Sequence, residues 1–188
     1  VSQAVLQANR LYLNKLKKTP KGITNILPML VKKYGSSKKS TLTEEDLKLG
    51  VYIEPKLDGV RCLIQCDQIH QYKWDRVTAY SRTGKEWKNI DHILAELRPF
   101  FEKFPNIVLD GELYNHDLRD DFEKIISLVR KTKPTLEDRL DAEELTQFHC
   151  YDIIDEELPF DQRIEFVNEA LMLLGDSIYI VETTQCFT

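Results

Sequence analysis

Four short runs of β-branched and aromatic residues lie within residues 50–82, and they constrain the fold more than any other feature of the sequence. The runs are GVYIEP, VRCLIQC, IHQYKW and RVTAYSR, and turn-forming residues separate them. Such runs are typical of β-strands. A parallel pair of strands needs a crossover connection of about a dozen residues or more, and these runs lie too close together for that. The sequence therefore predicts antiparallel pairing in this region.

The rest of the chain alternates between helical and extended patterns. TEED at 43–46 has the composition of a helix start, with Thr43 as its cap. Periodic apolar residues predict further helices, and β-rich runs predict further strands. The predicted helices are 2–18, 89–104, 121–131 with an extension or a second helix through 145, and 160–174, and the predicted strands are 106–114, 148–154 and 177–183. We therefore predict an α+β fold with mainly antiparallel sheets flanked by helices.

Charge and cysteine usage narrow the class of protein. The net charge is −5, but residues 1–50 contain ten Lys and Arg against three Asp and Glu. A basic arm on an acidic body is compatible with phosphate contact along one face, and equally with a solvated lysine-rich helix and linker. The four cysteines form no CxxC pair and no zinc-ligand spacing, so we expect a reduced, intracellular protein. No apolar run is long enough to span a bilayer, which argues against a membrane role.

The stretch IEPKLDGVRCLI, residues 53–64, places Lys56 between two predicted strands. Asp58 and Gly59 predict a tight turn that projects this lysine into a cleft. An amine with the ordinary lysine pKa of about 10.4 is protonated at neutral pH, but neighbouring cations and partial burial lower that pKa. Lys56 is therefore a candidate nucleophile. Taken alone, the stretch is better explained as a surface turn with an exposed ion pair.

Two further stretches carry polar groups of a matching kind. SRTGKE (81–86) offers Ser81, Arg82 and Lys85 around a glycine, a combination suited to binding ribose or phosphate oxygens. VLDGELY places Asp110 and Glu112 on one face of a strand, because alternate residues of a strand share a face. Two carboxylates there suit a divalent cation or a nucleotide hydroxyl. Each stretch alone is also consistent with an ordinary polar turn.

The stretch FHCYDII, residues 148–154, places Tyr151 and Asp152 near the end of a predicted strand. Tyr151 is a candidate for stacking on a base, because every base offers a π-face to an aromatic ring. An aromatic residue of the core is the alternative reading, and it suits Phe148 better than Tyr151.

Together, the four stretches resemble the motifs of ATP-dependent DNA ligases of the phage or viral type, in the covalent nucleotidyltransferase superfamily. KLDGVR is similar to the K-x-D-G-x-R motif, SRTGKE to S-R-x-G, LDGEL to D-G-E, and the YD of FHCYDII to the aromatic-Asp motif. LPMLVKKYG resembles the proline-anchored segment upstream of the lysine, and FEKIISLVRK and PFDQRIEFV resemble connecting helices. The resemblance implies the ATP-grasp-like nucleotidyltransferase domain of DNA ligases.

The resemblance also implies a role for individual residues. Lys56 would attack the α-phosphorus of ATP and hold AMP as a phosphoramidate. The residues implied to bind the nucleotide are Glu54 near the adenine edge, Leu57 beside the lysine, Arg61 and Arg82 near ribose and phosphate, Glu112 at the ribose hydroxyls or Mg²⁺, and Tyr151 stacked on adenine. Arg163 matches an arginine found downstream in the family. The cofactors implied are ATP and Mg²⁺.

The resemblance has limits at both ends of the chain. We expect residues 1–26 to form a basic helix and linker, and residues 27–188 to form the adenylation domain. The family carries E-G and K-x-K motifs and an OB-type domain farther along, whereas this sequence ends at Thr188. We therefore expect a truncated adenylation domain with weak or absent self-adenylation and no nick sealing.

Other functions share part of this pattern. An NAD-dependent ligase also uses K-L-D-G, but its next residues generally lack the arginine at the position of Arg61. An RNA ligase or an mRNA capping guanylyltransferase shares the lysine chemistry, and a non-catalytic nucleotide-binding module is possible without it. The favoured function is a monomeric ATP-dependent DNA ligase. It would act on nicked double-stranded DNA in repair, replication or recombination, in the cytoplasm, the nucleoid or a viral replication site.

Overall fold

The computed structural model describes residues 28, 32–37, 41–67, 76–172 and 174–187. The chain divides into two compact units, one of residues 1–53 with 184–188 and one of residues 54–183. We call them the first and the second unit. The predicted helix 2–18 and the predicted strand IHQYKW lie outside the described residues, as does the proposed boundary at residue 26.

The first unit contains helix α2 (Glu44–Leu49) and a pair of short strands. Thr43 caps the helix as predicted: its hydroxyl accepts a hydrogen bond from the backbone of Asp46, and the Asp46 carboxylate accepts one from the backbone of Thr43. Strand β1 (Val51–Ile53) pairs antiparallel with β7 (Thr184–Cys186). The sequence predicts one strand over 177–183, but β6 ends at Ile180 and β7 is a separate strand in the other unit.

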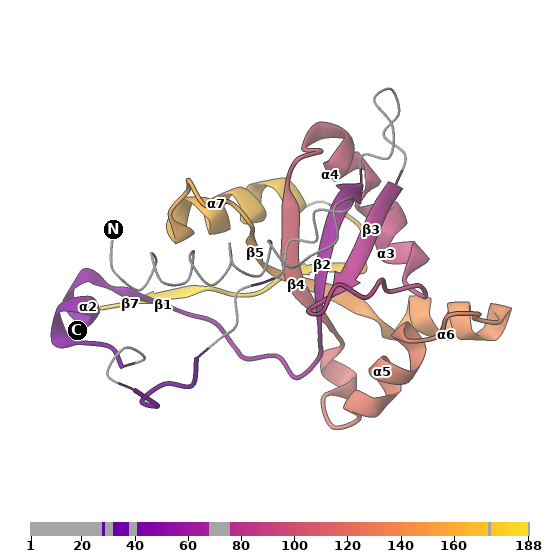
Figure 1. The fold of residues 1–188 in the computed structure, drawn as a ribbon, viewed down its shortest axis with the longest axis horizontal. Coiled ribbons are helices and arrows are strands. Elements are labelled where there is room, and N and C mark those ends of the chain that lie inside the picture. The colour runs from indigo at the N-terminus through magenta and orange to yellow at the C-terminus, as the bar shows by residue number, and fades with distance from the viewer. Residues whose placement is uncertain (1–27, 29–31, 38–40, 68–75, 173, 188) are drawn as a thin grey trace. The chain divides into compact units, whose positions relative to one another are not determined.

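The second unit is built on a five-stranded sheet in the order β3-β2-β4-β5-β6 (Figure 1). The strands are β2 (Val60–Asp67), β3 (Arg76–Ser81), β4 (Val108–Tyr114), β5 (Gln147–Ile153) and β6 (Ile178–Ile180). All neighbours pair antiparallel except β5 and β6, which are parallel. The prediction of an α+β fold with mainly antiparallel sheets is confirmed.

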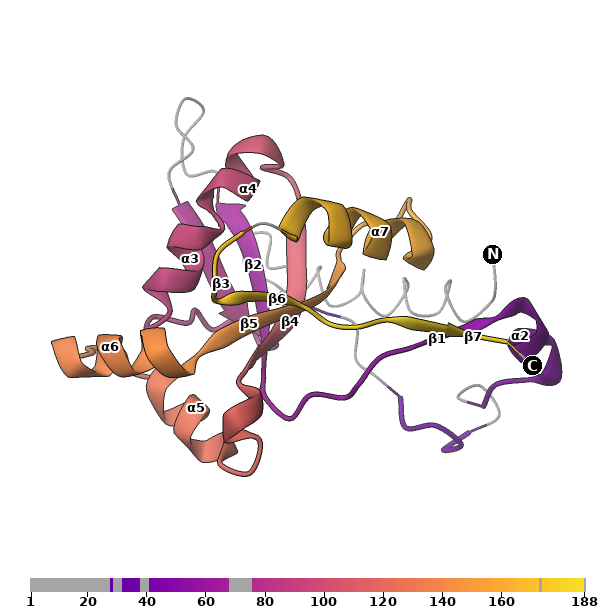
Figure 2. The same cartoon turned by 180° about the vertical axis from the view of Figure 1, so that it is seen from behind.

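Helices cover one face of this sheet (Figures 1 and 2). They are α3 (Asp91–Glu96), α4 (Arg98–Lys103), α5 (Phe122–Val129) and α7 (Phe160–Leu171). Helix α6 (Leu136–Leu145) packs against α5, and a short 3₁₀ turn, η2 (His116–Leu118), follows β4. Apolar side chains of α3, α4, α5 and α7 share one core with the buried strand residues Cys62, Ile64, Leu109, Leu113, Phe148 and Cys150. The single helix predicted over 89–104 is wrong, because it divides at Leu97, before Pro99. A proline lacks the backbone N–H that would continue the helix.

The opposite face of the sheet carries the polar residues of the motifs. Arg61 of β2 lies opposite Glu112 of β4, and Asp110 shares the face of Glu112 because it stands two residues away. The register between β4 and β5 shifts by one residue, since Asp110 pairs with Asp152 while Gly111 pairs with Cys150. Tyr151 is the extra residue of this β-bulge. A bulge lets consecutive side chains share one face, and Tyr151 and Asp152 both lie on the polar face.

Candidate functional site

Lys56 lies on an extended connector between Ile53 and Val60 and is exposed. The predicted tight turn at Asp58 and Gly59 is wrong, because the connector contains only a bend at Gly59. The glycine serves close approach instead of turning. A Cβ atom at this position would lie 2.4 Å from the backbone oxygen of Leu113 and 2.7 Å from Cγ of Glu112. The connector that carries Lys56 is therefore pressed against β4.

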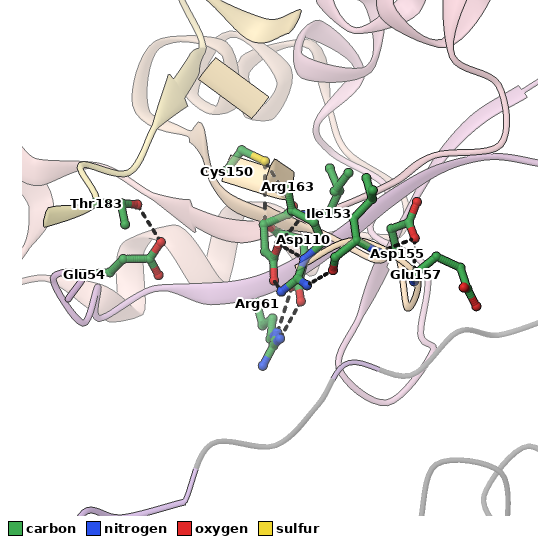
Figure 3. Close-up of polar contacts among 11 residues, drawn as sticks. Glu54, Arg61, Asp110, Cys150, Ile153, Asp155, Glu157, Arg163 and Thr183 are labelled. Atoms are coloured by element: carbon green, nitrogen blue, oxygen red, sulfur yellow. Dashed lines mark hydrogen bonds and ion pairs between the residues drawn. The ribbon is translucent and has the colours of Figure 1, made fainter. Parts of the chain in front are cut away.

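Arg61, Asp110 and Tyr151 form one network on the polar face, and Figure 3 shows the contact of Arg61 with Asp110. Arg61 donates from Nε to Oδ1 of Asp110 at 2.9 Å and from Nη2 to Oδ2 at 2.5 Å. The Tyr151 hydroxyl donates to Oδ1 of the same carboxylate at 3.2 Å, and the Arg61 guanidinium lies 5.6 Å from the centre of the Tyr151 ring. Burial and the neighbouring carboxylates raise the pKa of the Tyr151 hydroxyl, so it stays a donor. The network fixes both the arginine and the tyrosine ring.

Glu112 lies beside this network and beside the lysine. Burial raises the pKa of its carboxyl to about 7, and the negative charge of Asp110 adds to the effect. The positive charges of Arg61 and Lys56 and a hydrogen bond from the Gly59 backbone oppose the rise. Lys56 is therefore close enough to Glu112 to influence its ionisation. A carboxyl with a pKa near 7 gains a proton or loses it readily near neutral pH.

Asp152 and Glu54 form a second pair of acidic positions next to the bulge. Arg163 of α7 binds both oxygens of Asp152, at 2.8 and 3.0 Å, and donates to the backbone oxygen of Leu158 at 2.7 Å. Glu54 accepts a hydrogen bond of 2.9 Å from the Thr183 hydroxyl. Burial raises the pKa of Glu54, the Thr183 bond opposes this, and the negative charge of Asp152 adds to the rise. Thr183 was not singled out in the sequence.

Arg82 is placed differently from Arg61. It lies exposed in the turn after β3, where the Ser81 oxygen accepts from the Gly84 backbone at 2.8 Å and the Ser81 hydroxyl accepts from the Lys85 backbone at 3.0 Å. Gly84 has a φ of 80°, which favours glycine. The turn is well defined, and it does not bring Arg82 into the Arg61 network.

Leu57 lines a pocket of about 410 Å³ on the second unit. A row of rings from three adjacent strands contributes to this pocket: His149 stacks on Tyr179 at 4.8 Å, and Tyr114 meets His149 edge-on at 5.2 Å. Burial lowers the pKa of His149 to about 4, so this imidazole is uncharged near neutral pH. Sequence reasoning missed these three residues. The alternation of β4 was the available signal, because Tyr114 shares the face of Glu112.

A metal ion would find few protein ligands in the described part of the chain. No group of three or more His, Cys, Asp or Glu side chains among the described residues is arranged to hold one. Both oxygens of Asp110 are bound by Arg61, which leaves Glu112 as the carboxylate available beside them. Such a site fits Mg²⁺ in the manner common to nucleotide enzymes, where one or two carboxylates act together with substrate phosphates.

The geometry accords with a comparison against known families. A family model described as "ATP dependent DNA ligase domain" matches residues 28–187. The chain belongs to this family. The predicted resemblance to ATP-dependent DNA ligases is thereby confirmed.

Solved structures show the same fold. A structure described as "Pmar-Lig_Pre." matches with a TM-score of 0.54 and 25% identity, over 71% of this chain and 30% of that chain. A structure from "DNA binding with a minimal scaffold: Structure-function analysis of Lig E DNA ligases" matches with a TM-score of 0.52 and 22% identity, over 76% of this chain and 47% of that chain. The chain thus spans between about a third and a half of the length of these structures. Comparison with curated protein sequences gave no match.

We also asked whether any helix of the described residues could cross a membrane. None of them combines the length and the apolar character that crossing a bilayer requires.

Proposed function

We propose that this chain is the adenylation domain of an ATP-dependent DNA ligase in which Lys56 takes AMP from ATP. One observation carries the proposal beyond the family match. Strands β2, β4 and β5 bring Arg61, Glu112 and Tyr151 to one face of the sheet, and the charge of Lys56 acts on Glu112 there. A nucleophile, cations, a carboxylate and an aromatic ring are the groups that the reaction needs.

The proposed step is a phosphoryl transfer. The uncharged Lys56 amine attacks the α-phosphorus, a P–N bond forms, and the bond between the α-phosphorus and the bridging oxygen breaks. Pyrophosphate leaves with the electron pair of that bond, and the amine loses a proton to a base or to water. Negative charge gathers on the phosphorus oxygens and on the leaving group, so nearby arginines provide the main stabilisation.

The surrounding residues would bind and orient the nucleotide. Tyr151 stacks on the adenine, Glu54 accepts from its amino edge, and Leu57 gives an apolar contact beside the lysine. Arg61 and Arg82 contact ribose and phosphate oxygens, and Glu112 accepts from the ribose hydroxyls or holds Mg²⁺. When bound, Mg²⁺ would neutralise phosphate charge. Arg163 holds Asp152 next to the stacking tyrosine.

The second half of the proposal concerns the destination of AMP. In the protein that carries this chain, AMP would pass from Lys56 to the 5′-phosphate of a nick in double-stranded DNA, and the 3′-hydroxyl would then displace AMP and seal the strand. We assign that protein to DNA repair, replication or recombination, as a monomer inside the cell.

The test is covalent labelling. The protein that carries this chain, at its natural length, is incubated with α-labelled ATP and Mg²⁺, denatured, and counted for bound label. A lysyl phosphoramidate survives denaturation and is released by mild acid, because protonation of its nitrogen weakens the P–N bond. We expect label on the natural sequence, none on Lys56→Ala, and undiminished label on Lys124→Ala, a control at a partly exposed lysine of α5.

The nucleotide that labels the protein decides between this function and its rivals. Label from GTP alone would identify a capping-type guanylyltransferase, and label from NAD alone would identify an NAD-dependent ligase. If no nucleotide labels the protein that carries this chain, a non-catalytic nucleotide-binding module replaces the ligase.

A further inference from the structure

The contact between Thr183 and Glu54 joins two positions that are 129 residues apart in the sequence. Figure 3 shows it apart from the Arg61–Asp110 network, with the threonine hydroxyl pointing at the carboxylate. The hydroxyl donates to Oε1 of Glu54 at 2.9 Å, and its other acceptor, the backbone oxygen of Val181, is 3.5 Å away. A hydroxyl has one hydrogen to donate, so the shorter bond to Glu54 takes it. Thr183 therefore holds one oxygen of the carboxylate in place.

The second oxygen of Glu54 is left for a ligand. Among the described residues, Oε2 of Glu54 accepts no hydrogen bond. Both residues are half-buried, so this oxygen is partly shielded from water. Glu54 stands two positions before Lys56 on the same connector, so the two residues are close along the chain. A base delivered to Lys56 with its nucleotide would present its edge to this oxygen.

We propose that Thr183 is a specificity-determining residue that positions Glu54 to select a purine with a 6-amino group. This inference rests on the proposed function of the site. An ionised carboxylate can only accept hydrogen bonds. The amino group of adenine donates to it, whereas the 6-oxo group of guanine is an acceptor and is repelled. A site whose buried polar group is left unpaired rejects the wrong ligand strongly.

Thr183 also favours the ionised form of Glu54, which is the form that selects adenine over guanine. A protonated carboxyl can donate as well as accept, and it would bind guanine almost as well as adenine. Burial and Asp152 raise the pKa of Glu54, and the Thr183 hydrogen bond opposes them. The charged and titratable groups that act on this position from the sheet are Asp152 and the Cys150 thiol, and Arg163 of α7 binds Asp152 in turn. Loss of the hydroxyl shifts the balance toward the protonated form, and lower pH does the same.

The experiment compares ATP with GTP in the protein that carries this chain. Equilibrium binding and covalent labelling are both measured for the natural sequence, Thr183→Val, Thr183→Ser, Glu54→Gln and Glu54→Ala. Thr183→Val keeps the size of the side chain without the donor, and Thr183→Ser keeps the donor. We expect Thr183→Val to lower the preference for ATP over GTP by about tenfold, the scale of one lost hydrogen bond in a partly buried site. Thr183→Ser should restore most of it, and Thr184→Val, at an exposed neighbour, should leave it unchanged.

Two further results show whether Thr183 acts through Glu54. Thr183→Val should change the preference very little when Glu54→Ala is already present, because no side-chain acceptor is then left for Thr183 to position. The preference of the natural sequence should decline as the pH falls, and that of Glu54→Gln should not. An unchanged preference in Thr183→Val would overturn the inference, as would fully additive effects of the two substitutions.

The same measurements separate this inference from the proposed function. If Lys56→Ala binds ATP with the natural preference but takes no label, the covalent role of Lys56 stands independently of Thr183. If the natural sequence binds ATP over GTP and takes no label, while Thr183→Val loses the preference, the inference on Thr183 holds and the covalent step fails. Binding of neither nucleotide to the natural sequence would overturn both.

Discussion

Two arginines with similar assigned roles differ sharply in their surroundings. Arg61 has a side chain that is 19% exposed, and its guanidinium is bound to both oxygens of Asp110. Arg82 is exposed, in a turn organised by its neighbours, and no hydrogen bond or ion pair joins it to another described residue. Asp110 holds the Arg61 guanidinium in place, whereas no described residue holds that of Arg82. A motif residue can therefore be fixed in advance by the protein framework or left for a ligand to orient, and the motif alone does not distinguish the two cases.

The same contrast holds for the acidic residues. Asp110 is 5% exposed and engaged by Arg61 and Tyr151, whereas Glu112, two residues away on the same face, has no comparable bidentate partner among the described residues. A buried ion pair is costly to break, because the remaining charge has no water around it. Substitutions at framework residues should thus act on folding, and substitutions at surface residues should act on nucleotide binding.

The largest expected effect comes from breaking the framework at Asp110. Asp110→Ala removes the carboxylate that binds Arg61 through two hydrogen bonds, and it removes the acceptor of the Tyr151 hydroxyl. We expect the free energy of unfolding to fall by about 3 to 5 kcal/mol, measured by chemical denaturation. Asp110→Leu combined with Arg61→Met should recover much of this loss, because it removes both charges. If Asp110→Ala is as stable as the natural sequence, Asp110 is not a framework residue.

The next effect is a dependence of stability on pH through Glu112. Its pKa is raised from 4.5 to about 7 in the folded protein, so the folded state holds the proton more tightly than the unfolded chain. Below about pH 4.5 the carboxyl is protonated in both states, so the raised pKa does not change the free energy of unfolding. As the pH rises from there toward 7, the free energy of unfolding falls by about 3 kcal/mol in all. Denaturation at pH 5 and pH 8 should show this loss for the natural sequence relative to Glu112→Gln. Equal pH dependence in the two proteins would refute the assignment.

A smaller effect is expected where the lysine connector meets β4. Gly59→Ala places a methyl group 2.4 Å from the Leu113 oxygen, and the backbone must move to relieve it. We expect a loss of about 2 kcal/mol in stability and a reduced rate of labelling at Lys56. Glycine has a different function at Gly35, where φ is 71° and no atom would meet a Cβ within 4 Å. Gly35→Ala should therefore cost stability without affecting the labelling rate.

The smallest effect on stability is expected at Arg82. Arg82→Ala should change the free energy of unfolding by no more than about 0.5 kcal/mol, because an exposed side chain is removed. ATP binding should nevertheless weaken by about tenfold, since one charge-assisted contact to the nucleotide is lost. Calorimetric titration with ATP, beside a melting curve, measures both. A large loss of stability in Arg82→Ala would remove the distinction between the two arginines.

Most of the helices and strands could be predicted from local patterns in the sequence. The cap at Thr43, the strand carrying Glu112 and the helices after it follow from spacing and composition, which act within a few residues. The division of the helix at Leu97 was also readable, because Pro99 is visible in the sequence. The separate strand β7 was not, because three residues of β-structure acquire meaning only through their pairing with β1.

The sequence predicted which residues form the candidate site, but not their hydrogen-bond partners or their pKa values. Motif spacing gives Lys56, Arg61 and Glu112, but it cannot say that Arg61 is committed to Asp110 or that Glu112 has a pKa near 7. Those properties depend on burial and on partners about 50 residues away. The contact of Thr183 with Glu54 has the same origin and left no local trace in the sequence. The turn at Gly59 was misread, because a glycine chosen for close packing looks the same as a glycine chosen for turning.

The register shift at Tyr151 has a consequence for how this domain can change during evolution. Point substitutions at Tyr151 or Asp152 alter one side chain at a time, but deletion of one residue there would remove the bulge and bring the whole strand into a single register. Cys150 and Ile153 would keep their inward positions, because the bulge is the one place where β5 departs from strict alternation. A deletion elsewhere in β5 would instead exchange the inward and outward positions of every residue on one side of it, and would expose core side chains. The core of this domain can therefore tolerate the loss of one residue from β5 only at the bulge, where the side chain that is lost comes from the polar face.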